Sequence, residues 1–355
     1  MIKLRILDKQ ELSEWNSVAE RFPDATLFHT IEWLNFLETT SHLEKLPLGI
    51  YEDCQMVGVF PALLTRKGPF KILGSPLTGW GTPHMGPLVE VRLLDEVMEA
   101  FNDFVRQLKV DYLEVCFPQA ELSLPSMGGY TSEPKGTYIL QMVNNEETMW
   151  AMLRGRCKTC VRHAIKSKVE IREVEDRGWV EQYYPMLLGT FAKSGFAPSK
   201  AKQFYYDLWD FLKPVNRVRV LLAEHDGKPI ACGAWVTHNC TITQCAQASL
   251  REYHRLCPNN LIQWHIIKWA SANGFQRYDL NGKGIPSIDR FKESLGSEAA
   301  WHTTYARAAN PMARIGKCAY ARIELTARKL RHRMYRLREM TRRKGPDEGT
   351  DPNVS

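Results

Sequence analysis

Four basic residues with helical spacing are the first residues in this chain that could do chemistry. Arg154, Lys158, Arg162 and Lys166 recur at every fourth position, and on a helix this spacing places four cations along one face. Like charges at this spacing repel one another, so stability does not favour the row. Arginine and lysine side chains suit phosphate groups. We interpret the row as a site for a pyrophosphate or an RNA backbone, and a solvated helix face is the alternative.

An acidic residue stands near the end of a short apolar strand. Tyr278 and Asp279 lie in this strand, and Asn281 and Gly282 follow it in a turn. The carboxyl ends of strands are where α/β sheets bind ligands. Asp279 could therefore orient or deprotonate a bound group, or it could cap the turn.

The elements that must position these residues alternate between strands and helices. The sequence predicts a helix that opens at Thr30, further helices over 93–108 and 260–273, and strands over 2–7, 46–51, 56–64, 112–117, 219–224, 230–236, 241–248 and 275–280. Two hairpins are each followed by a helix and by a strand that carries Tyr112 or Tyr278, roughly 170 residues apart. We interpret this as two copies of one α/β unit. The alternative is that any two α/β domains contain such hairpins.

These patterns predict an α/β fold in four segments. A chain of 355 residues is long enough for two domains. We expect an N-terminal lobe over 1–145 and a C-terminal lobe over 146–310. A basic amphipathic helix is expected over 311–344, and a disordered tail over 345–355.

The positive charge of the chain is concentrated near its C-terminus. Residues 1–313 hold 35 basic and 35 acidic residues, whereas residues 314–344 hold twelve basic residues against Glu324 and Glu339. Apolar residues there recur at approximate helical spacing. Such a helix could lie on an anionic membrane surface, follow tRNA phosphates, or pack on the second lobe with its charges solvated.

Several classes of protein are not supported by the composition. No run approaches the roughly 18–20 apolar residues that cross a bilayer, and the N-terminus lacks the features of a signal peptide. We expect a cytoplasmic protein, with peripheral contact to the inner face of the membrane through 314–344. Cys157 and Cys160 form a lone pair that cannot fill a tetrahedral zinc site. No catalytic-triad order, HExxH, P-loop or GxGxxG motif stands out, and we predict no metal site.

Three segments together resemble the closing part of the FemABX-type acyltransferases, a GNAT-like family of peptidoglycan-bridge aminoacyltransferases and exopolysaccharide-associated relatives. They are a loop and helix over 258–264, a buried strand and Gly-containing turn over 278–282, and a Phe-Lys pair ahead of a glycine over 291–296. The basic segment over 158–171 is also similar to the family pattern, with Lys158 in place of the usual arginine. The resemblance covers about 30–307 and implies tandem GNAT-like lobes.

The resemblance implies roles for particular residues. Phe291 and Lys292 would lie beside the acyl donor, with Lys292 stabilising the negative charge that acyl transfer builds on the carbonyl oxygen. A surface lysine on a short helix is the alternative. Asp279 would assist the acceptor. Lys71 and Trp80 could touch a nucleotide-sugar acceptor, because Trp80 lies in a loop similar to a family loop near the acceptor site; a surface hairpin turn is the alternative.

The donor site is expected at the start of the helix over 260–273. GNAT enzymes that use coenzyme A usually carry a glycine-rich loop there, whereas the segment 251–260 contains no glycine. The helix N-terminus still offers free N–H groups. This is compatible with an aminoacyl-tRNA donor or with a looser acyl-CoA site, and the alternative is an ordinary loop in which Asn259 caps the helix. The predicted donor-binding residues are Arg251, Arg255, Asn259 and Asn260.

We therefore predict an N-acyltransferase that moves an acyl or aminoacyl group to an amine of a cell-envelope precursor, of peptidoglycan or of exopolysaccharide. The acceptor, a small or lipid-linked molecule, would attack the donor carbonyl directly. Acyl-CoA or aminoacyl-tRNA would be the co-substrate, without a tightly bound cofactor. The alternative is a non-catalytic module that binds RNA or a membrane surface on a decayed acyltransferase fold.

Overall fold

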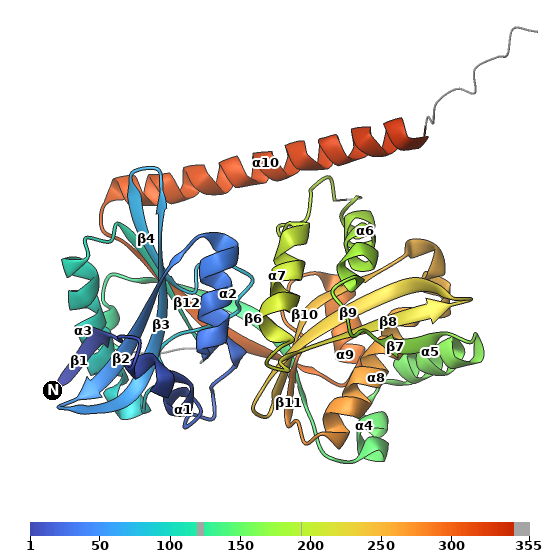
Figure 1. Ribbon diagram of the computed structural model, residues 1–355, viewed down its shortest axis with the longest axis horizontal. Coiled ribbons are helices and arrows are strands. Elements are labelled where there is room, and N and C mark those ends of the chain that lie inside the picture. Colours follow the sequence, from blue (N-terminus) through green and yellow to red (C-terminus); the bar gives the residue numbers. More distant parts are fainter. Residues whose placement is uncertain (119–123, 193, 344–355) are drawn as a thin grey trace, which may run out of the picture.

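The computed structural model describes residues 1–118, 124–192 and 194–343, with side chains described up to Tyr335. Its strands are β1 (Ile2–Ile6), β2 (Glu44–Glu52), β3 (Gln55–Lys67), β4 (Phe70–Ser75), β5 (Tyr112–Phe117), β6 (Thr131–Gln141), β7 (Glu170–Glu173), β8 (Val218–His225), β9 (Lys228–His238), β10 (Thr241–Ser249), β11 (Arg277–Asp279) and β12 (Glu298–Ala308). They form one continuous sheet in the order β1-β2-β3-β4-β5-β12-β6-β11-β10-β9-β8-β7 (Figure 1).

Helices pack against this sheet, and the long C-terminal helix crosses the molecule beside it (Figure 1). The α-helices are α1 (Trp15–Ala19), α2 (Ile31–Ser41), α3 (Leu94–Gln107), α4 (Glu146–Met152), α5 (Gly155–Lys166), α6 (Trp179–Phe191), α7 (Lys202–Leu212), α8 (Pro258–Ala272), α9 (Pro286–Ser294) and α10 (Pro311–Arg343). Short 3₁₀ helices are η1 (Glu11–Glu14), η2 (Leu27–His29), η3 (Val91–Leu93), η4 (Pro125–Met127) and η5 (Arg251–Leu256). The predicted α/β class with a basic C-terminal helix is confirmed.

Local sequence signals explain several element ends. The Thr30 hydroxyl accepts a hydrogen bond from the Trp33 N–H at 3.3 Å and caps α2. Asp226 and Gly227 both have positive φ, 50° and 71°, in the turn of the β8–β9 hairpin. That conformation is the one that a tight hairpin turn requires.

The same arrangement of elements occurs twice. In the first lobe, which we define as β1–β5 with α1–α3, the β2–β3 hairpin precedes the parallel pair β4–β5. In the second lobe, defined as β6–β11 with α4–α9, the β8–β9 hairpin precedes the parallel pair β10–β11. The long helices α3 and α8 connect the two strands of each parallel pair. The two lobes thus follow one plan.

One strand joins the lobes into a single sheet. β12 follows the last helix of the second lobe and pairs antiparallel with β6 on one side and with β5 of the first lobe on the other. It lies in the middle of the sheet order. The sheet is therefore continuous through the junction, and the lobes face each other across it.

α10 lies across both lobes (Figure 1). Its Lys317 Nζ donates to Glu114 Oε1 of the first lobe at 2.7 Å. Its Arg328 Nε donates to the Ala197 carbonyl of the second lobe at 3.0 Å. Among the described residues, no helix, this one included, is long and apolar enough to cross a membrane.

Candidate active site

Two neighbouring parallel strands of the second lobe diverge where they end. β10 and β11 pair over three residues of each strand, after which β10 continues along β9 alone. The β9–β10 register shifts between Gln244 and Ala246, so Cys245 is the extra residue of a β-bulge. Because ligands bind at the carboxyl ends of parallel strands, we expect a ligand beyond Asp279.

The turn after β11 is fixed from behind. The Asn281 N–H donates to Asp279 Oδ1 at 2.8 Å, and the Thr137 hydroxyl donates to the same oxygen at 2.5 Å. Lys292 Nζ donates to the backbone carbonyls of Asn281 and Gly282. Asn281 and Gly282 have positive φ of 55° and 52°, which glycine adopts freely and asparagine more easily than most residues. Asp279 and Lys292 therefore hold a tight turn that carries the Asn281 side chain.

Burial shifts the pKa values of both Asp279 and Lys292 behind the turn. Asp279 is 4% exposed and Lys292 is 6% exposed. Burial raises the pKa of Asp279, against the opposing effect of the Thr137 hydroxyl and the Asn281 N–H. Burial lowers the pKa of Lys292, against the opposing effect of the Asp289 and Asp279 carboxylates. The charge of each group is thus supported by the charge of the other.

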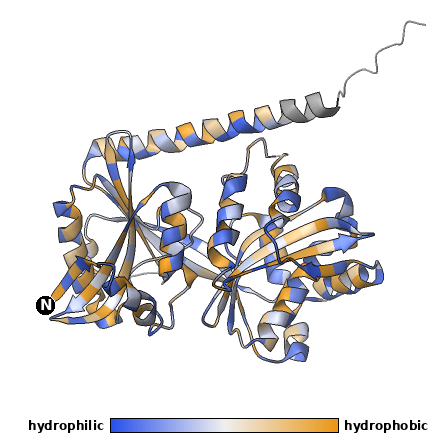
Figure 2. Cartoon of the chain, in the orientation of Figure 1, coloured by the Kyte–Doolittle hydropathy of each residue, from blue (hydrophilic) through white to orange (hydrophobic). Residues whose placement is uncertain are grey.

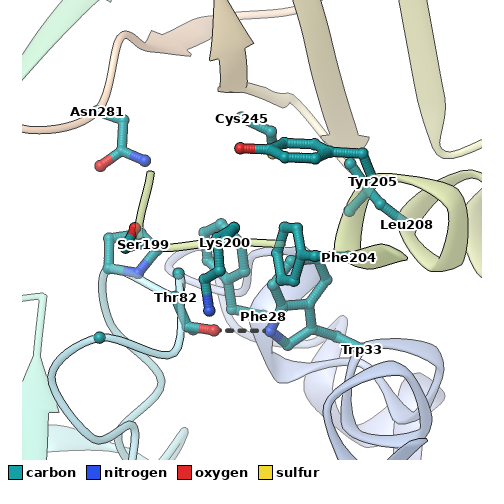
Figure 3. Close-up of a pocket in the computed structure, with 13 residues that line it drawn as sticks. Phe28, Trp33, Thr82, Ser199, Lys200, Phe204, Tyr205, Leu208, Cys245 and Asn281 are labelled. Carbon is teal, nitrogen blue, oxygen red and sulfur yellow. Dashed lines mark hydrogen bonds between the residues drawn. The ribbon is translucent and has the colours of Figure 1, made fainter. Parts of the chain in front are cut away.

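A cleft of about 340 Å³ opens between the lobes at this turn (Figure 3). On the first-lobe side, Trp33 Nε1 donates to Thr82 Oγ1 at 3.0 Å. On the second-lobe side, Tyr205 and Cys245 lie opposite these residues. The cleft is lined by Phe28, Trp33, Gly79, Gly81, Thr82, Pro83, Ser199, Lys200, Phe204, Tyr205, Leu208, Cys245 and Asn281.

Lys200 is the basic residue that lines this cleft. Burial lowers the pKa of its ammonium to about 8. No carboxylate of the described residues forms an ion pair with it, and its Nζ lies 4.6 Å from the centroid of the Phe204 ring. Its side chain crosses Gly81 of the first lobe, where a Cβ would lie 3.0 Å from Lys200 Cε and where φ is +80°. A cation without a carboxylate in an aromatic cleft favours an anionic ligand.

Behind the cleft, a network of amides fills the space between β10 and α8. Gln263 of α8 is fully buried, and its Nε2 donates to Gln244 Oε1 at 2.7 Å and to Gln247 Oε1 at 2.8 Å. The Tyr278 hydroxyl donates to Gln263 Oε1 at 2.7 Å and accepts from Trp235 Nε1 at 2.7 Å. A ligand that entered between these elements would have to displace this network.

The predicted basic row lies on α5, outside the cleft. Arg154, Arg162 and Lys166 are exposed, Lys158 Nζ donates to the Ala151 carbonyl at 3.0 Å, and Arg154 lies 3.8 Å from a Glu293 carboxylate oxygen. α5 packs against α8 and η5. The row is thus brought beside the predicted donor-binding residues of η5, so that the two groups share one side of the second lobe.

The predicted donor-binding residues divide into two kinds. Arg251 and Arg255 are exposed on η5. Asn259 instead donates to Ser249 Oγ at 2.9 Å, and Asn260 donates to Cys157 Sγ at 3.5 Å. The interpretation of Asn259 as the helix cap is wrong, because α8 begins at Pro258 with its N-cap one residue earlier.

The other predicted residues do not line the cleft. Lys71 Nζ donates to the Leu108 carbonyl at 2.9 Å, and Lys71 lines a separate hollow of the first lobe. It stands near the start of β4, whereas the cleft loop follows the end of that strand. Trp80 is half-buried, and its ring covers Gly74, although residues on both sides of it line the cleft. Phe291 packs against the core of the second lobe.

Sequence reasoning missed most of the cleft. Lys200 and Ser199 belong to a loop between α6 and α7, and Tyr205 to α7, for which the sequence analysis predicted no elements. Phe28 precedes the predicted helix at Thr30. A lysine among Gly, Pro and Ser residues gives no signal by itself, because its role depends on how the two lobes meet.

Comparison with known proteins agrees with this architecture. Residues 153–293 match the model of the Acetyltransferase (GNAT) domain family. The crystal structure of FemX matches with a TM-score of 0.67 at 12% identity, covering 91% of this chain and 100% of that chain. A search of curated protein sequences found no relative of the chain.

Two further solved structures have the same fold. A tandem GNAT protein from the clavulanic acid biosynthesis pathway matches with a TM-score of 0.55 at 12% identity, covering 88% of this chain and 99% of that chain. The C-terminal domain of a putative lysylphosphatidylglycerol synthetase from Agrobacterium fabrum matches with a TM-score of 0.54 at 9% identity, covering 86% of this chain and 94% of that chain. The predicted resemblance and the tandem GNAT-like fold are therefore confirmed.

Proposed function

We propose that this chain, a FemX-like protein with two GNAT-like lobes, transfers an acyl or aminoacyl group to an amine of a cell-envelope precursor. The observation that carries the proposal is that the Lys200 cation and the Asn281 turn face the same interlobe cleft. The GNAT domain over 153–293 supports acyl transfer. The likeness to FemX and to a putative lysylphosphatidylglycerol synthetase supports an acceptor of the cell envelope.

The reaction follows from the groups at the strand ends. The neutral acceptor amine attacks the donor carbonyl, the bond from that carbon to its carrier breaks, and the amine proton passes to solvent. Negative charge builds on the carbonyl oxygen, where a fixed N–H donor stabilises it. The Asn281 side chain lines the cleft at the strand ends, where its Nδ2 donates to the Gln244 carbonyl at 3.5 Å, and we assign it this role. Lys292 and Asp279 act behind it as positioning residues, because direct contact would require the Lys292 ammonium to leave the two carbonyls that it binds.

The acceptor is held by its anionic part. Lys200 has no carboxylate partner among the described residues, so a phosphate of the acceptor would meet a cation without breaking an ion pair. The rings of Trp33, Phe28 and Phe204 offer apolar faces beside it. A nucleotide-linked and a lipid-linked precursor share this chemistry, and both carry the phosphate that Lys200 would bind.

Of the two donor classes, aminoacyl-tRNA fits the second lobe better. The exposed cations of α5 and η5 lie on one side of that lobe and suit an extended phosphate backbone. The segment 251–260 has no glycine to bring its backbone against a pyrophosphate, and the Gln263 network fills the space behind it. Acyl-CoA is the second candidate, because the matched domain family is described as acetyltransferases.

Transfer assays with purified protein test the proposal. Labelled acetyl-CoA and mixed labelled aminoacyl-tRNA serve as donors, with nucleotide-linked and lipid-linked muramyl-peptide precursors as acceptors. We expect transfer from aminoacyl-tRNA. Transfer from acetyl-CoA alone would show that acyl-CoA, and not aminoacyl-tRNA, is the donor. Binding of tRNA without transfer to either acceptor would favour the non-catalytic alternative.

Two substitutions locate the reaction in the cleft. Lys200→Met should raise the acceptor KM by roughly 10- to 100-fold, as expected for the loss of a charge-assisted contact, and leave tRNA binding unchanged. Lys202→Met is the matched control, since Lys202 pairs with Glu181 and does not line the cleft. Asn281→Ala should lower kcat by roughly 100-fold. Wild-type kinetics in both cleft variants would place the reaction elsewhere.

A further inference from the structure

α10 contacts the body of the protein at separate points along its length. Gly316 lies against the Phe70 ring, where a Cβ would be 2.5 Å from Phe70 Cε2. Further along, the Arg328 and Lys329 side chains lie 5.7 Å and 5.4 Å from the Phe196 ring centroid. These contacts fix a helix of 33 residues, about 50 Å long at 1.5 Å per residue, across both lobes.

A row of apolar side chains on α10 is exposed to solvent. Met312, Ile315, Ile323, Leu330 and Met334 are 71%, 68%, 64%, 53% and 53% exposed. Steps of three, four, seven and eight residues keep them on one face of a helix. Figure 2 shows the alternation of apolar and polar residues along α10. Leaving such a row in water is unfavourable, and apolar side chains gathered on one exposed face of a basic helix suit an interface with acyl chains.

Basic side chains accompany this row. Arg314, Arg322, Lys329 and Arg333 are exposed, and their spacing of eight, seven and four residues also keeps them on one face. Between residues 311 and 335, where side chains are described, the acidic residue is Glu324, which pairs with Arg331 at 2.8 Å. The exposed surface of α10 therefore carries a basic row beside the apolar row, and Lys329 of the basic row also contacts the Phe196 ring.

We propose that this surface, formed by the apolar row and the four basic residues, docks on an anionic membrane surface with α10 lying in the plane of the interface. A bilayer interface accepts apolar side chains among its acyl chains and attracts basic side chains through its headgroups. An RNA backbone would bind the basic residues but would leave the Ile and Leu side chains in water. The apolar row and the basic row together therefore favour a membrane surface over RNA as the binding partner.

Docking would also orient the cleft. The Ala197 N–H donates to the Arg328 carbonyl at 3.1 Å, and Arg328 Nε donates to the Ala197 carbonyl. Ala197 lies three residues before Lys200. The loop that supplies Lys200 is thus attached to the helix that would lie on the bilayer. The inference does not rest on the proposed reaction, because binding is measured without turnover.

Vesicle co-sedimentation of the full chain tests the docking. The probes are phosphatidylcholine vesicles with and without phosphatidylglycerol, at low and high salt. We expect binding to the anionic vesicles that weakens with salt. Replacement of Arg314, Arg322, Lys329 and Arg333 by Gln should lower the partition coefficient at least about tenfold, because each basic residue near the surface is worth roughly fivefold. The control variant has the same change of charge at exposed residues elsewhere, Lys3, Lys9, Arg21 and Lys109.

A second variant tests the apolar row. Replacement of Ile315, Ile323 and Leu330 by Gln should reduce vesicle binding at least about tenfold while its salt dependence remains. The control replaces exposed apolar residues outside α10, Val91, Val143 and Val215, and circular dichroism confirms folding of each variant. Absence of binding to anionic vesicles, equal binding by the α10 and control variants, or salt-sensitive binding to tRNA alone through the same basic residues would overturn the proposal.

Discussion

The two lobes repeat one plan, yet the long helices that connect their parallel strands bury different side chains against the sheet. In the first lobe, α3 packs apolar side chains against the sheet, with the Phe101 and Phe60 ring centroids 4.4 Å apart. In the second lobe, the corresponding helix α8 buries Gln263 in a hydrogen-bonded network beside the cleft. At this position the first lobe has an apolar contact, whereas the second lobe has a buried polar network.

The acidic residues near the strand ends also differ. Glu114 of β5 accepts from Lys317 of α10 and from the Thr78 N–H, both at 2.7 Å. Asp279 of β11 holds the turn that carries Asn281 into the cleft. Both acids thus bind the backbone of a segment that leads to the cleft, and the first-lobe acid in addition binds Lys317 of a helix from outside the repeat. The two acids thus differ in that only Glu114, of these two, is tied to α10.

The largest expected effect is on the apolar packing of the first lobe. Phe101→Ala should lower the free energy of unfolding by about 3–5 kcal/mol, because it removes a fully buried ring and leaves a cavity. Urea unfolding followed by fluorescence and circular dichroism measures this. Val91→Ala is the matched control, since Val91 is 73% exposed and should change stability by less than about 0.5 kcal/mol. A loss below about 1 kcal/mol for Phe101→Ala would contradict the close packing of α3 on the sheet.

The next effect concerns histidines buried where the lobes meet. Burial is the main cause that lowers the pKa of His29 to about 3, and the charge of His238 contributes less. Burial is also the main cause that lowers the pKa values of His238 and His302 to about 4. The unfolded chain takes up these protons near pH 6.5, so the stability from neutral histidines is complete above that pH and declines as the pH falls toward 4.

Unfolding measured across this pH range tests the assignment. His29 alone should remove about 2 kcal/mol between pH 6.5 and pH 5, at about 1.4 kcal/mol per pH unit. His29→Asn should flatten the slope, because an asparagine oxygen can accept from the Thr26 N–H as His29 Nδ1 does at 3.1 Å. An unchanged slope in this variant would mean that other groups cause the acid sensitivity.

A smaller effect is expected from the polar network of the second lobe. Gln263→Leu leaves the Tyr278 hydroxyl and the Gln244 amide with fewer partners and should cost about 1–3 kcal/mol. The exposed Gln276→Leu serves as its control. We also expect transfer activity to fall, because the network supports the strand ends beside the cleft. A gain in stability with full transfer activity would show that the Gln263 network supports neither the fold nor the reaction.

Much of the fold could be predicted from local sequence. The hairpins, the Thr30 cap, the helix around Phe101 and the basic row of α5 all depend on spacing within a few residues, which periodicity and turn chemistry record. The position of β12 between β5 and β6 could not be predicted, because it depends on pairing across more than a hundred residues of chain.

The site was predictable only in part for the same reason. The turn after Tyr278 was located because a strand, an acid and a glycine adjoin in the sequence. Its partner across the cleft, Lys200, lies in a loop whose importance arises from contact with Gly81 of the other lobe. The role of Lys292 was expected at the reacting carbonyl, whereas the side chain binds the Asn281 and Gly282 carbonyls. Sequence spacing shows which residues are near one another, but not which way a buried ammonium points.

The smallest expected effect sharpens the contrast between the two acids. Burial acts to raise the pKa of Glu114, but hydrogen bonds from Lys317 and the Thr78 N–H outweigh it and lower the pKa. Glu114→Gln removes the charge that holds Lys317 and should cost about 1 kcal/mol.

The pH dependence of this cost identifies its origin. A carboxyl whose folded pKa is lowered contributes stability above its unfolded pKa, near 4.3, and loses it as the pH falls through the folded value. The difference in unfolding free energy between wild type and Glu114→Gln should therefore be complete at pH 6 and shrink below pH 4. Transfer activity should stay unchanged, because Glu114 does not line the cleft and a glutamine oxygen can still accept from the Thr78 N–H. A loss of transfer without a loss of stability would instead assign the first lobe a direct part in the reaction.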